Sequence, residues 1–398
     1  MPLVFVTAAR LLDGRGGPPI EPGRVLIEGD RIRSLGARLQ PPAEALRYDF
    51  PDATILPGLI DCHVHLADVG EADPKDSARE DDAVRVLRLA QHAARTLRAG
   101  VTTVRDVGGR NHLEFGFRQG VEAGLAIAPR LWLCGKIVSM TTPGADMWPG
   151  MYRQADGPWE VAKAVREQVK AGADVIKVMA TGAIMAPASE RPGQAQYRPD
   201  ELQAATETAH GLGRRVAAHA HGIEGIRNAV AAGVDTIEHG TYLHQDPAVA
   251  TQMAAGGIAL VPTLKAVTLL ANPPGPGIPA EIAEKARAAR DHAGRSFRLA
   301  MEAGVPIAMG TDAATSFNHH GENADELALM VGGGMTPMQA ITAATWTAAR
   351  ALGRDHELGS LQPGFLADLI IVRGDPLVDV SLLRQPPQAV FLGGRLVA

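Results

Sequence analysis

The sequence predicts an α/β fold: a (β/α)8 TIM barrel with a small β-sheet domain that both ends of the chain build. In the middle of the chain, apolar runs of four to seven residues alternate with Ala-rich stretches of helical period. Eight such pairs follow one another, which is typical of a barrel, although a doubly wound sheet uses the same alternation. A length of 398 residues suffices for one barrel with a smaller appended domain.

The two chain ends share a β-rich pattern. Residues 24–32 read as a β-hairpin with its turn at Gly29-Asp30. Near the other end, residues 367–372 and 389–392 read as strands separated by turn residues. We therefore expect the two ends to meet in one small domain. The predicted boundaries are 1–56 and 356–398 for the two parts of this domain and 57–355 for the barrel.

The barrel elements follow from the same periodicity. Four predicted helices end in an Ala-Gly pair just before a strand, and glycine is favoured directly after a last helical turn. The predicted helices are 79–99, 159–171, 199–212, 222–232 and 280–303. The predicted strands begin near Ile55, Val101, Leu131, Val175, Val216, Thr236, Ile258 and Ile307.

Composition excludes several classes of protein. A formal charge of −5 and a pI near 6.2 argue against a nucleic-acid partner or a polybasic membrane surface. The sequence lacks both a run of about 18 apolar residues and the pattern of a signal peptide, so we expect no membrane association and a cytoplasmic location. Cys62 and Cys134 are too few for a disulfide framework or a thiolate zinc site. With 13 histidines, nitrogen and oxygen are the expected ligands of any metal. The oligomeric state stays open, and a homo-oligomer is possible.

Histidines and one aspartate follow the predicted strands, where the active site of a barrel lies. His63 and His65 are two residues apart, so on a strand both imidazoles face the same side and can grip one ion. His219 and His221 repeat this spacing, and we prefer His219 as the ligand because it lies nearer the strand body. The remaining candidates are His239 and Asp312. Each pattern alone also fits an ordinary loop histidine or a helix cap.

Lys177 lies in a predicted buried strand between Ile176 and Val178, where an ammonium group is costly. It could form a Schiff base with a carbonyl substrate. Alternatively, it could react with CO2 to give a carbamate, whose two oxygens can each bind one of two metal ions. We favour the carbamate, because four neutral imidazoles around two dications leave an excess of positive charge that it and Asp312 would offset.

Several short motifs, in order along nearly the whole chain, resemble those of the metal-dependent amidohydrolase superfamily. The similar branch includes imidazolonepropionase-like proteins, Xaa-Pro dipeptidases (prolidases), Xaa-Arg/Lys carboxypeptidases and ochratoxin-degrading amidohydrolases. The motifs are residues 56–65 (LPGLIDCHVH), 100–106 (GVTTVRD), 172–177 (GADVIK), 217–222 (AAHAHG), 237–240 (IEHG), 310–312 (GTD) and 364–369 (GFLADL).

The resemblance implies that the domain built by both chain ends is a β-sandwich. It also implies a binuclear centre with two divalent ions, for which nitrogen and oxygen ligands make Zn2+ the default. Its ligands would be His63, His65 and Asp312 for one ion, His219 and His239 for the other, and carboxylated Lys177 between them. It implies that a hydroxide shared by the two ions attacks an amide-like C–N bond while Asp312 transfers the proton. The expected substrate is a small molecule or a dipeptide-like amide. The alternatives are a cyclic amidohydrolase of the imidazolonepropionase type and, from another class, a non-catalytic barrel scaffold.

The sequence departs from this branch at one loop. Many members carry Thr-Gly-Gly-His after strand three, but here residues 142–145 read Thr-Pro-Gly-Ala, so another group must assist the carbonyl or the substrate differs. Tyr242, His221 and His320 are the candidates for substrate contact. The loops after strands three and four are rich in methionine and aromatic residues, which favours a bulky, hydrophobic or aromatic substrate. These residues are Met140, Met147, Trp148, Met151, Tyr152, Met179 and Met185.

Overall fold

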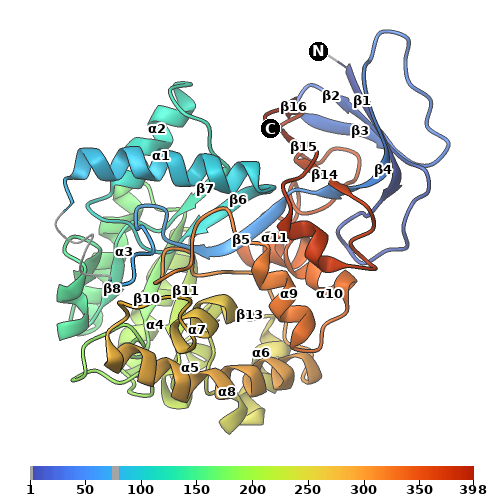
Figure 1. Ribbon diagram of the computed structural model, residues 1–398. Helices are drawn as coiled ribbons and strands as arrows, with labels where there is room; N and C mark the ends of the chain where they lie inside the picture. The colour runs from blue at the N-terminus through green and yellow to red at the C-terminus, as the bar shows by residue number, and fades with distance from the viewer. Residues whose placement is uncertain (1–2, 74–79) are drawn as a thin grey trace.

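The computed structural model describes residues 3–73 and 80–398, and it consists of two parts that lie side by side (Figure 1). One part is a sheet on which both termini lie. The other is a larger α/β body with helices around its strands. Strand β4 (Leu46–Pro57) belongs to the terminal sheet and leads directly into β5 (Leu59–Val64) of the body. The fold is therefore α/β with parallel-strand sheets, as predicted.

Strands from both chain ends pair in a single seven-stranded sheet, in the order β16-β15-β14-β4-β1-β2-β3. The predicted hairpin is confirmed, because β2 and β3 pair antiparallel on either side of Gly29-Asp30. Strand β4 lies at the junction, with β1 parallel on one side and β14 antiparallel on the other. The bounds of the other strands are β1 (Leu3–Leu11), β2 (Gly23–Glu28), β3 (Arg31–Leu35), β14 (Leu369–Arg373), β15 (Ala389–Leu392) and β16 (Arg395–Leu396).

The strands of the body are all paired in parallel, in a three-stranded sheet β5-β6-β7 and a six-stranded sheet β13-β12-β11-β10-β8-β9. Their carboxyl ends therefore point the same way within each sheet. The bounds are β6 (Val101–Asp106), β7 (Arg130–Leu133), β8 (Ile137–Ser139), β9 (Tyr152–Gln154), β10 (Val175–Met179), β11 (Arg215–Ala220), β12 (Thr236–His239) and β13 (Ala259–Val261).

The predicted strand near Ile307 is not a regular strand. Ile307 forms one isolated parallel bridge with Leu260 of β13, and Ala313 forms another with Val64 of β5. Pro306 has no amide hydrogen to donate, which interrupts a regular ladder at this point. The segment nevertheless connects the two sheets, because it hydrogen-bonds to β13 on one side and to β5 on the other.

The predicted helices appear as α1, α3, α4, α5 and α8, each within a few residues of its expected bounds. The predicted start at Arg79 lies outside the described residues. Gly172 ends α3 in the left-handed conformation at φ 114°, as expected for the glycine of an Ala-Gly pair. The α-helices are α1 (Asp82–Arg98), α2 (Leu113–Glu122), α3 (Pro158–Ala171), α4 (Pro199–Gly211), α5 (Ile223–Ala231), α6 (Pro247–Gly256), α7 (Leu264–Ala271), α8 (Ala280–Glu302), α9 (Asp325–Gly332), α10 (Pro337–Ala343) and α11 (Trp346–Leu352), and the short 3-10 helices are η1 (Pro143–Met147), η2 (Leu243–Gln245) and η3 (Val380–Arg384).

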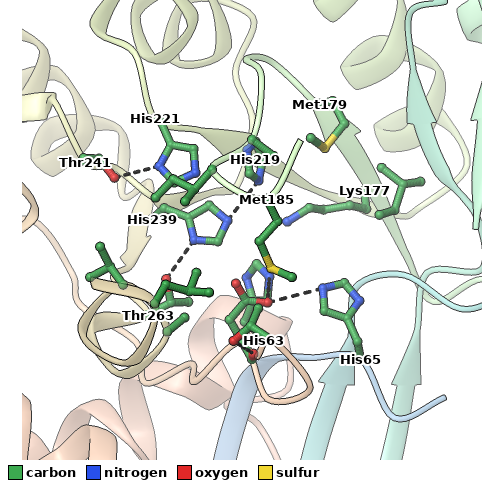
Figure 2. A pocket seen from close by; sticks show the side chains of 18 of the residues that line it. His63, His65, Lys177, Met179, Met185, His219, His221, His239, Thr241 and Thr263 are labelled. Carbon is green, nitrogen blue, oxygen red and sulfur yellow. Dashed lines mark hydrogen bonds and ion pairs between the residues drawn. The ribbon is translucent and has the colours of Figure 1, made fainter. Parts of the chain in front are cut away.

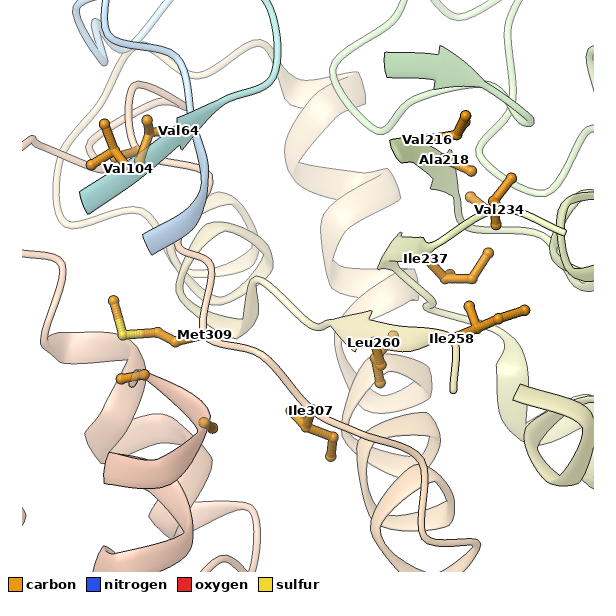
Figure 3. Packing of buried hydrophobic residues seen from close by; sticks show 14 of the residues in the cluster. Val64, Val104, Val216, Ala218, Val234, Ile237, Ile258, Leu260, Ile307 and Met309 are labelled. Atoms are coloured by element: carbon orange, nitrogen blue, oxygen red, sulfur yellow. The ribbon is translucent and has the colours of Figure 1, made fainter. Parts of the chain in front are cut away.

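The core of the body is formed by apolar side chains of successive strands (Figure 3). Val104, Val216, Ile237 and Leu260 are each at most 1% exposed, and they come from β6, β11, β12 and β13. Burying each of these side chains stabilises the folded state by about 1.5–3 kcal/mol, so this core holds the strand ends in place. Among the helices of the described chain, none combines the length and the apolar character that crossing a lipid bilayer requires.

Candidate metal centre

The histidines and the aspartate singled out by their spacing line one pocket at the ends of β5, β10, β11 and β12 (Figure 2). His219, His221 and His239 lie on one side, His63 and His65 lie opposite, and the Lys177 side chain extends between them. The residues that line the pocket from this group are His63, His65, Lys177, His219, His221, His239 and Asp312.

His63 is held by a buried carboxylate. Its Nδ1 lies 2.6 Å from Oε2 of Glu238, and the other oxygen of Glu238 accepts a 2.7 Å hydrogen bond from Arg105. Burial alone would raise the pKa of Glu238, but the Arg105 guanidinium and the Lys177 amine lower it well below its usual range. An ionised carboxylate only accepts, so Nδ1 of His63 carries the hydrogen and Nε2 presents a lone pair.

His65 is oriented in the same way. Its Nδ1 lies 3.0 Å from the carbonyl oxygen of Gly108, which fixes the hydrogen on Nδ1. The Nε2 atoms of His63 and His65 each lie 3.4 Å from Oδ1 of Asp312. Two imidazole nitrogens and one carboxylate oxygen therefore converge on one point, and this donor set is typical of a site for zinc or a similar divalent ion.

Asp312 has a backbone conformation that is unusual for a residue with a side chain, with φ 57°. Asn318 stabilises it by donating from Nδ2 to the Asp312 carbonyl at 3.0 Å, and the Thr315 amide donates to the same oxygen at 3.1 Å. His239 also has a positive φ of 69°. Strained backbone at two neighbouring positions of one pocket is typical of a functional site.

A second pair of imidazoles lies opposite. Nε2 of His219 faces the carbonyl oxygen of Gly182 at 3.2 Å, and Nδ1 of His239 lies 2.7 Å from the Thr263 hydroxyl. The other two ring nitrogens of His219 and His239 face each other at 2.9 Å. Burial lowers the pKa of both rings well below the usual value, so they are neutral. Two neutral rings that face one another are satisfied by one shared hydrogen or by a cation between them.

His221 completes this side of the pocket. Its Nδ1 lies 2.7 Å from the Thr241 hydroxyl, and its ring stacks on that of His239 with the centroids 4.7 Å apart. The donor atoms of His219, His221 and His239 lie within 4.8 Å of one another, and the same holds for His63, His239 and Asp312. Either group could hold a metal ion.

Lys177 lies on β10 between the two histidine groups and is 2% exposed. Its Nζ has no hydrogen-bond partner within the described residues. Burial lowers the pKa of Lys177 to about 8, a shift that Glu238 opposes and Arg105 reinforces. A buried, unpaired amine among metal-ligand side chains is an unstable arrangement unless another group joins the site.

Comparison with known proteins identifies the family. The model of the amidohydrolase family matches residues 54–397. The chain belongs to the amidohydrolase family. It is 32% identical to the ochratoxinase of Aspergillus niger, over 99% of this chain and 86% of that protein. It is 29% identical to the imidazolonepropionase of Paracoccus denitrificans, over 95% of each. A crystal structure of a Xaa-Pro dipeptidase with methionine bound in its active site superimposes with a TM-score of 0.92 and 33% identity, covering 99% of both chains.

The resemblance seen in the motifs is therefore confirmed, and this amidohydrolase is a hydrolase that acts on C–N bonds. Its pocket also has an apolar wall. Five of the seven residues expected there line the pocket, namely Trp148, Met151, Tyr152, Met179 and Met185. Met140 packs instead against the main core. Side chains of α7 and of the loop after β10 extend the wall, including Ile184, Ala266, Val267 and Leu270.

Two of the three expected substrate contacts lie elsewhere in the described structure. Tyr242 packs on His292, with ring centroids 4.8 Å apart, and lines a separate outer cleft. His320 stacks on His92 and places its Nε2 3.2 Å from the carbonyl oxygen of His65. It thus contacts the backbone of a pocket residue, while its own ring lines a different cavity. His221 alone of the three lines the main pocket.

The loop without the expected histidine is fixed by a residue that sequence reasoning did not single out. Glu190 accepts hydrogen bonds from the Thr142 hydroxyl and from the Gly144 amide, the latter at 3.1 Å. Its other oxygen accepts from the Ala183 amide at 3.3 Å. Glu190 is 5% exposed and joins the loop after β8 to the loop after β10. It therefore shapes the apolar wall.

Proposed function

We propose that this amidohydrolase is a binuclear metal-dependent enzyme that cleaves an amide or peptide-like C–N bond of a bulky hydrophobic or aromatic substrate. One observation carries the proposal: oriented imidazole nitrogens and the Asp312 carboxylate surround the unpaired Nζ of Lys177. The proposed ligands are His63, His65 and Asp312 for one ion and His219 and His239 for the other, with Zn2+ as the default ion.

Lys177 fits this centre as a carbamate. The neutral amine adds to the carbon of CO2, and the N–H proton is released, which leaves an anion with two oxygens on Nζ. The carbamate replaces an unpaired buried amine with an anion that offers two ligand atoms. It thereby avoids the cost of a buried ammonium group and offsets part of the charge of two dications.

The proposed mechanism divides the work between the ions and the chain. Bound metal ions would lower the pKa of a water molecule and polarise the scissile carbonyl. Asp312 accepts the proton of that water at its carboxylate and then delivers it to the leaving nitrogen. The Glu238 and Gly108 acceptors hold His63 and His65 in the required tautomers. The apolar wall keeps bulk water from the reacting groups.

The substrate class rests on the wall of the pocket. Trp148, Met151 and Met179 pack there with Ile137, and methionine and aromatic side chains suit a bulky apolar group. The similarity to ochratoxinase and to a Xaa-Pro dipeptidase supports N-acyl amino acids, ochratoxin-like amides or dipeptides as substrates.

The proposal extends to the architecture. We infer that the parallel strands of residues 57–355 close into a (β/α)8 barrel, since the segment around Ile307 links β13 to β5. We further infer that residues 1–56 and 356–398 together form a β-sandwich domain. In a barrel the catalytic groups lie at the carboxyl ends of the strands, where the histidines lie here.

Hydrolysis of paired substrates tests the proposal. Zinc-loaded protein supplied with bicarbonate is assayed on N-acyl-Phe and N-acyl-Leu beside N-acyl-Gly and N-acyl-Asp, with the products separated and identified. We expect two products from each substrate and a higher kcat/KM for the Phe and Leu compounds.

Faster turnover of the Gly and Asp compounds would contradict the substrate class. A single ring-opened product from a cyclic amide, with no cleavage of the acyclic ones, would favour an imidazolonepropionase-like activity. No turnover of any amide would favour the scaffold.

A further inference from the structure

Tyr152 is a polar residue within the apolar wall of the pocket. It lies on β9, where it pairs with Ile137 of β8, and its ring lies 6.3 Å from that of Trp148. Its side chain lines the same pocket as the candidate metal ligands. Tyr152 is therefore a phenol in a pocket wall whose other members are methionine, tryptophan and aliphatic side chains, and it also lines an adjoining cavity beside Glu190.

The other hydroxyl groups that line the pocket are already engaged. The Thr241 and Thr263 hydroxyls bond to His221 and His239, and the Thr315 hydroxyl donates to the carbonyl oxygen of Asp312 at 2.9 Å. Asp68, which also lines the pocket, accepts a 2.7 Å hydrogen bond from Arg85. The Tyr152 hydroxyl, by contrast, has no hydrogen bond to any residue in the described part of the chain. A hydroxyl in an apolar wall is satisfied only by water or by a ligand.

The chemistry of the phenol suits a donor. Burial raises the pKa of Tyr152 above its usual value, and the carboxylates of Glu190, Asp68 and Asp312 raise it further. The hydroxyl thus keeps its hydrogen at neutral pH. Tyr152 and Asp312 line the same pocket.

Amide hydrolysis needs a donor of this kind. As the water oxygen bonds to the carbonyl carbon, the C=O π electrons move onto the carbonyl oxygen, and a positioned donor stabilises that charge. In residues 142–145 of the loop after β8, the Thr142 hydroxyl is bound to Glu190, and Pro143, Gly144 and Ala145 have no side-chain donor, so the donor comes from another position. We propose that Tyr152 donates a hydrogen bond from its hydroxyl to the carbonyl oxygen of the scissile amide as negative charge develops there.

This inference rests on the proposed function, and Tyr152→Phe tests it, because that substitution removes only the hydroxyl. The variant, the wild type and a matched Tyr48→Phe control are assayed on the same N-acyl-Phe substrate at equal metal content. Tyr48 packs on Phe391 in the terminal sheet, far along the chain from the pocket residues. We expect kcat of Tyr152→Phe to fall on the order of 10²-fold, as when one such donor is removed, with KM little changed. Tyr48→Phe should match the wild type.

A phosphonate analogue of the substrate provides a second readout, because its tetrahedral oxygens mimic the charge of the transition state. The affinity of Tyr152→Phe for this analogue should fall by the same factor as its kcat/KM. The Tyr152→His variant keeps a hydrogen-bond donor, so it should retain more activity than Tyr152→Phe. An unchanged kcat, or a change in KM alone, would overturn the role of Tyr152. If the metal-loaded wild type cleaves no amide, the proposed function fails instead, so the two failures are distinguishable.

Discussion

Nδ1 of His63 and Oε2 of Glu238 lie 2.6 Å apart, and this contact joins the carboxyl ends of β5 and β12 beneath the candidate metal centre. Both side chains are buried, and the second oxygen of Glu238 is bound by Arg105. The contact fixes which nitrogen of His63 faces the pocket. Glu238 is therefore a positioning residue that acts through His63.

The substitution Glu238→Gln should weaken metal binding. A glutamine amide cannot satisfy Arg105 and His63 as well as a carboxylate, so the His63 tautomer is no longer fixed. We expect metal affinity to fall about 10- to 100-fold, as for other partners of metal-bound histidines. Competition with a chelator measures this metal affinity. Glu207→Gln, on the exposed face of α4, is the matched control, and equal affinity in both variants would contradict the role of Glu238.

The substitution Asp312→Asn should abolish turnover, because the amide cannot accept the proton of the attacking water. We expect kcat to fall about 10²- to 10⁴-fold, the range for loss of a general base. Metal content is measured on the same sample, so that loss of the ion is separated from loss of the base. A variant with near-normal kcat would refute the proton transfer by Asp312.

Reconstitution of metal-free protein should depend on CO2 and on pH through Lys177. Burial lowers the pKa of Lys177 to about 8, and the neutral amine that adds to CO2 is the form present above that pKa. At a fixed concentration of dissolved CO2, the recovery of activity on adding Zn2+ should therefore become faster as the pH rises through about 8. Lys177→Ala should lose metal and activity together, and the exposed Lys163→Ala should keep both. Recovery that needs no CO2 would rule out the carbamate.

An ion pair joins the terminal sheet to the α/β body. Arg130 of β7 binds Asp368, which precedes β14, through two hydrogen bonds of 2.6 and 2.9 Å. Arg130→Leu leaves the Asp368 carboxylate buried, with the Gly393 amide as its one remaining partner among the described residues, at a cost of about 2 kcal/mol. We expect a lower melting temperature with unchanged kcat. An unchanged melting temperature would show that the pair contributes nothing to the folded state.

Local signals predicted much of this structure. The i, i+2 spacing of His63 and His65 placed both on one side of a strand, and the glycine after Ala171 ends its helix as expected. The prediction of a regular strand near Ile307 was wrong. The segment forms isolated bridges, because Pro306 lacks one amide hydrogen that a regular ladder needs. Tyr242 and His320 lie within a few residues of the correct strand ends, but packing against His292 and His92 turns their rings away from the pocket.

Other features had no local signal. Glu190 acts by joining two loops more than 40 residues apart in the chain, and only the fold brings them together. Glu238 precedes His239 in the sequence, but its partnership with His63 spans 175 positions. Tyr152 is a candidate because the Thr241 and Thr263 hydroxyls already hydrogen-bond to His221 and His239. These hydrogen bonds likewise join different strand ends. Long-range partners of this kind follow from packing and cannot be read from spacing.

The binuclear centre is the central claim, and metal titration tests it most directly. Protein stripped of metal by a chelator is titrated with Zn2+ in the presence of bicarbonate, and amide hydrolysis is measured with metal content at each step. Because two groups of candidate ligands lie around Lys177, we expect activity to rise until about two equivalents of Zn2+ are bound per chain. Full activity in the metal-free protein, or a maximum at one equivalent with no further binding, would contradict the account.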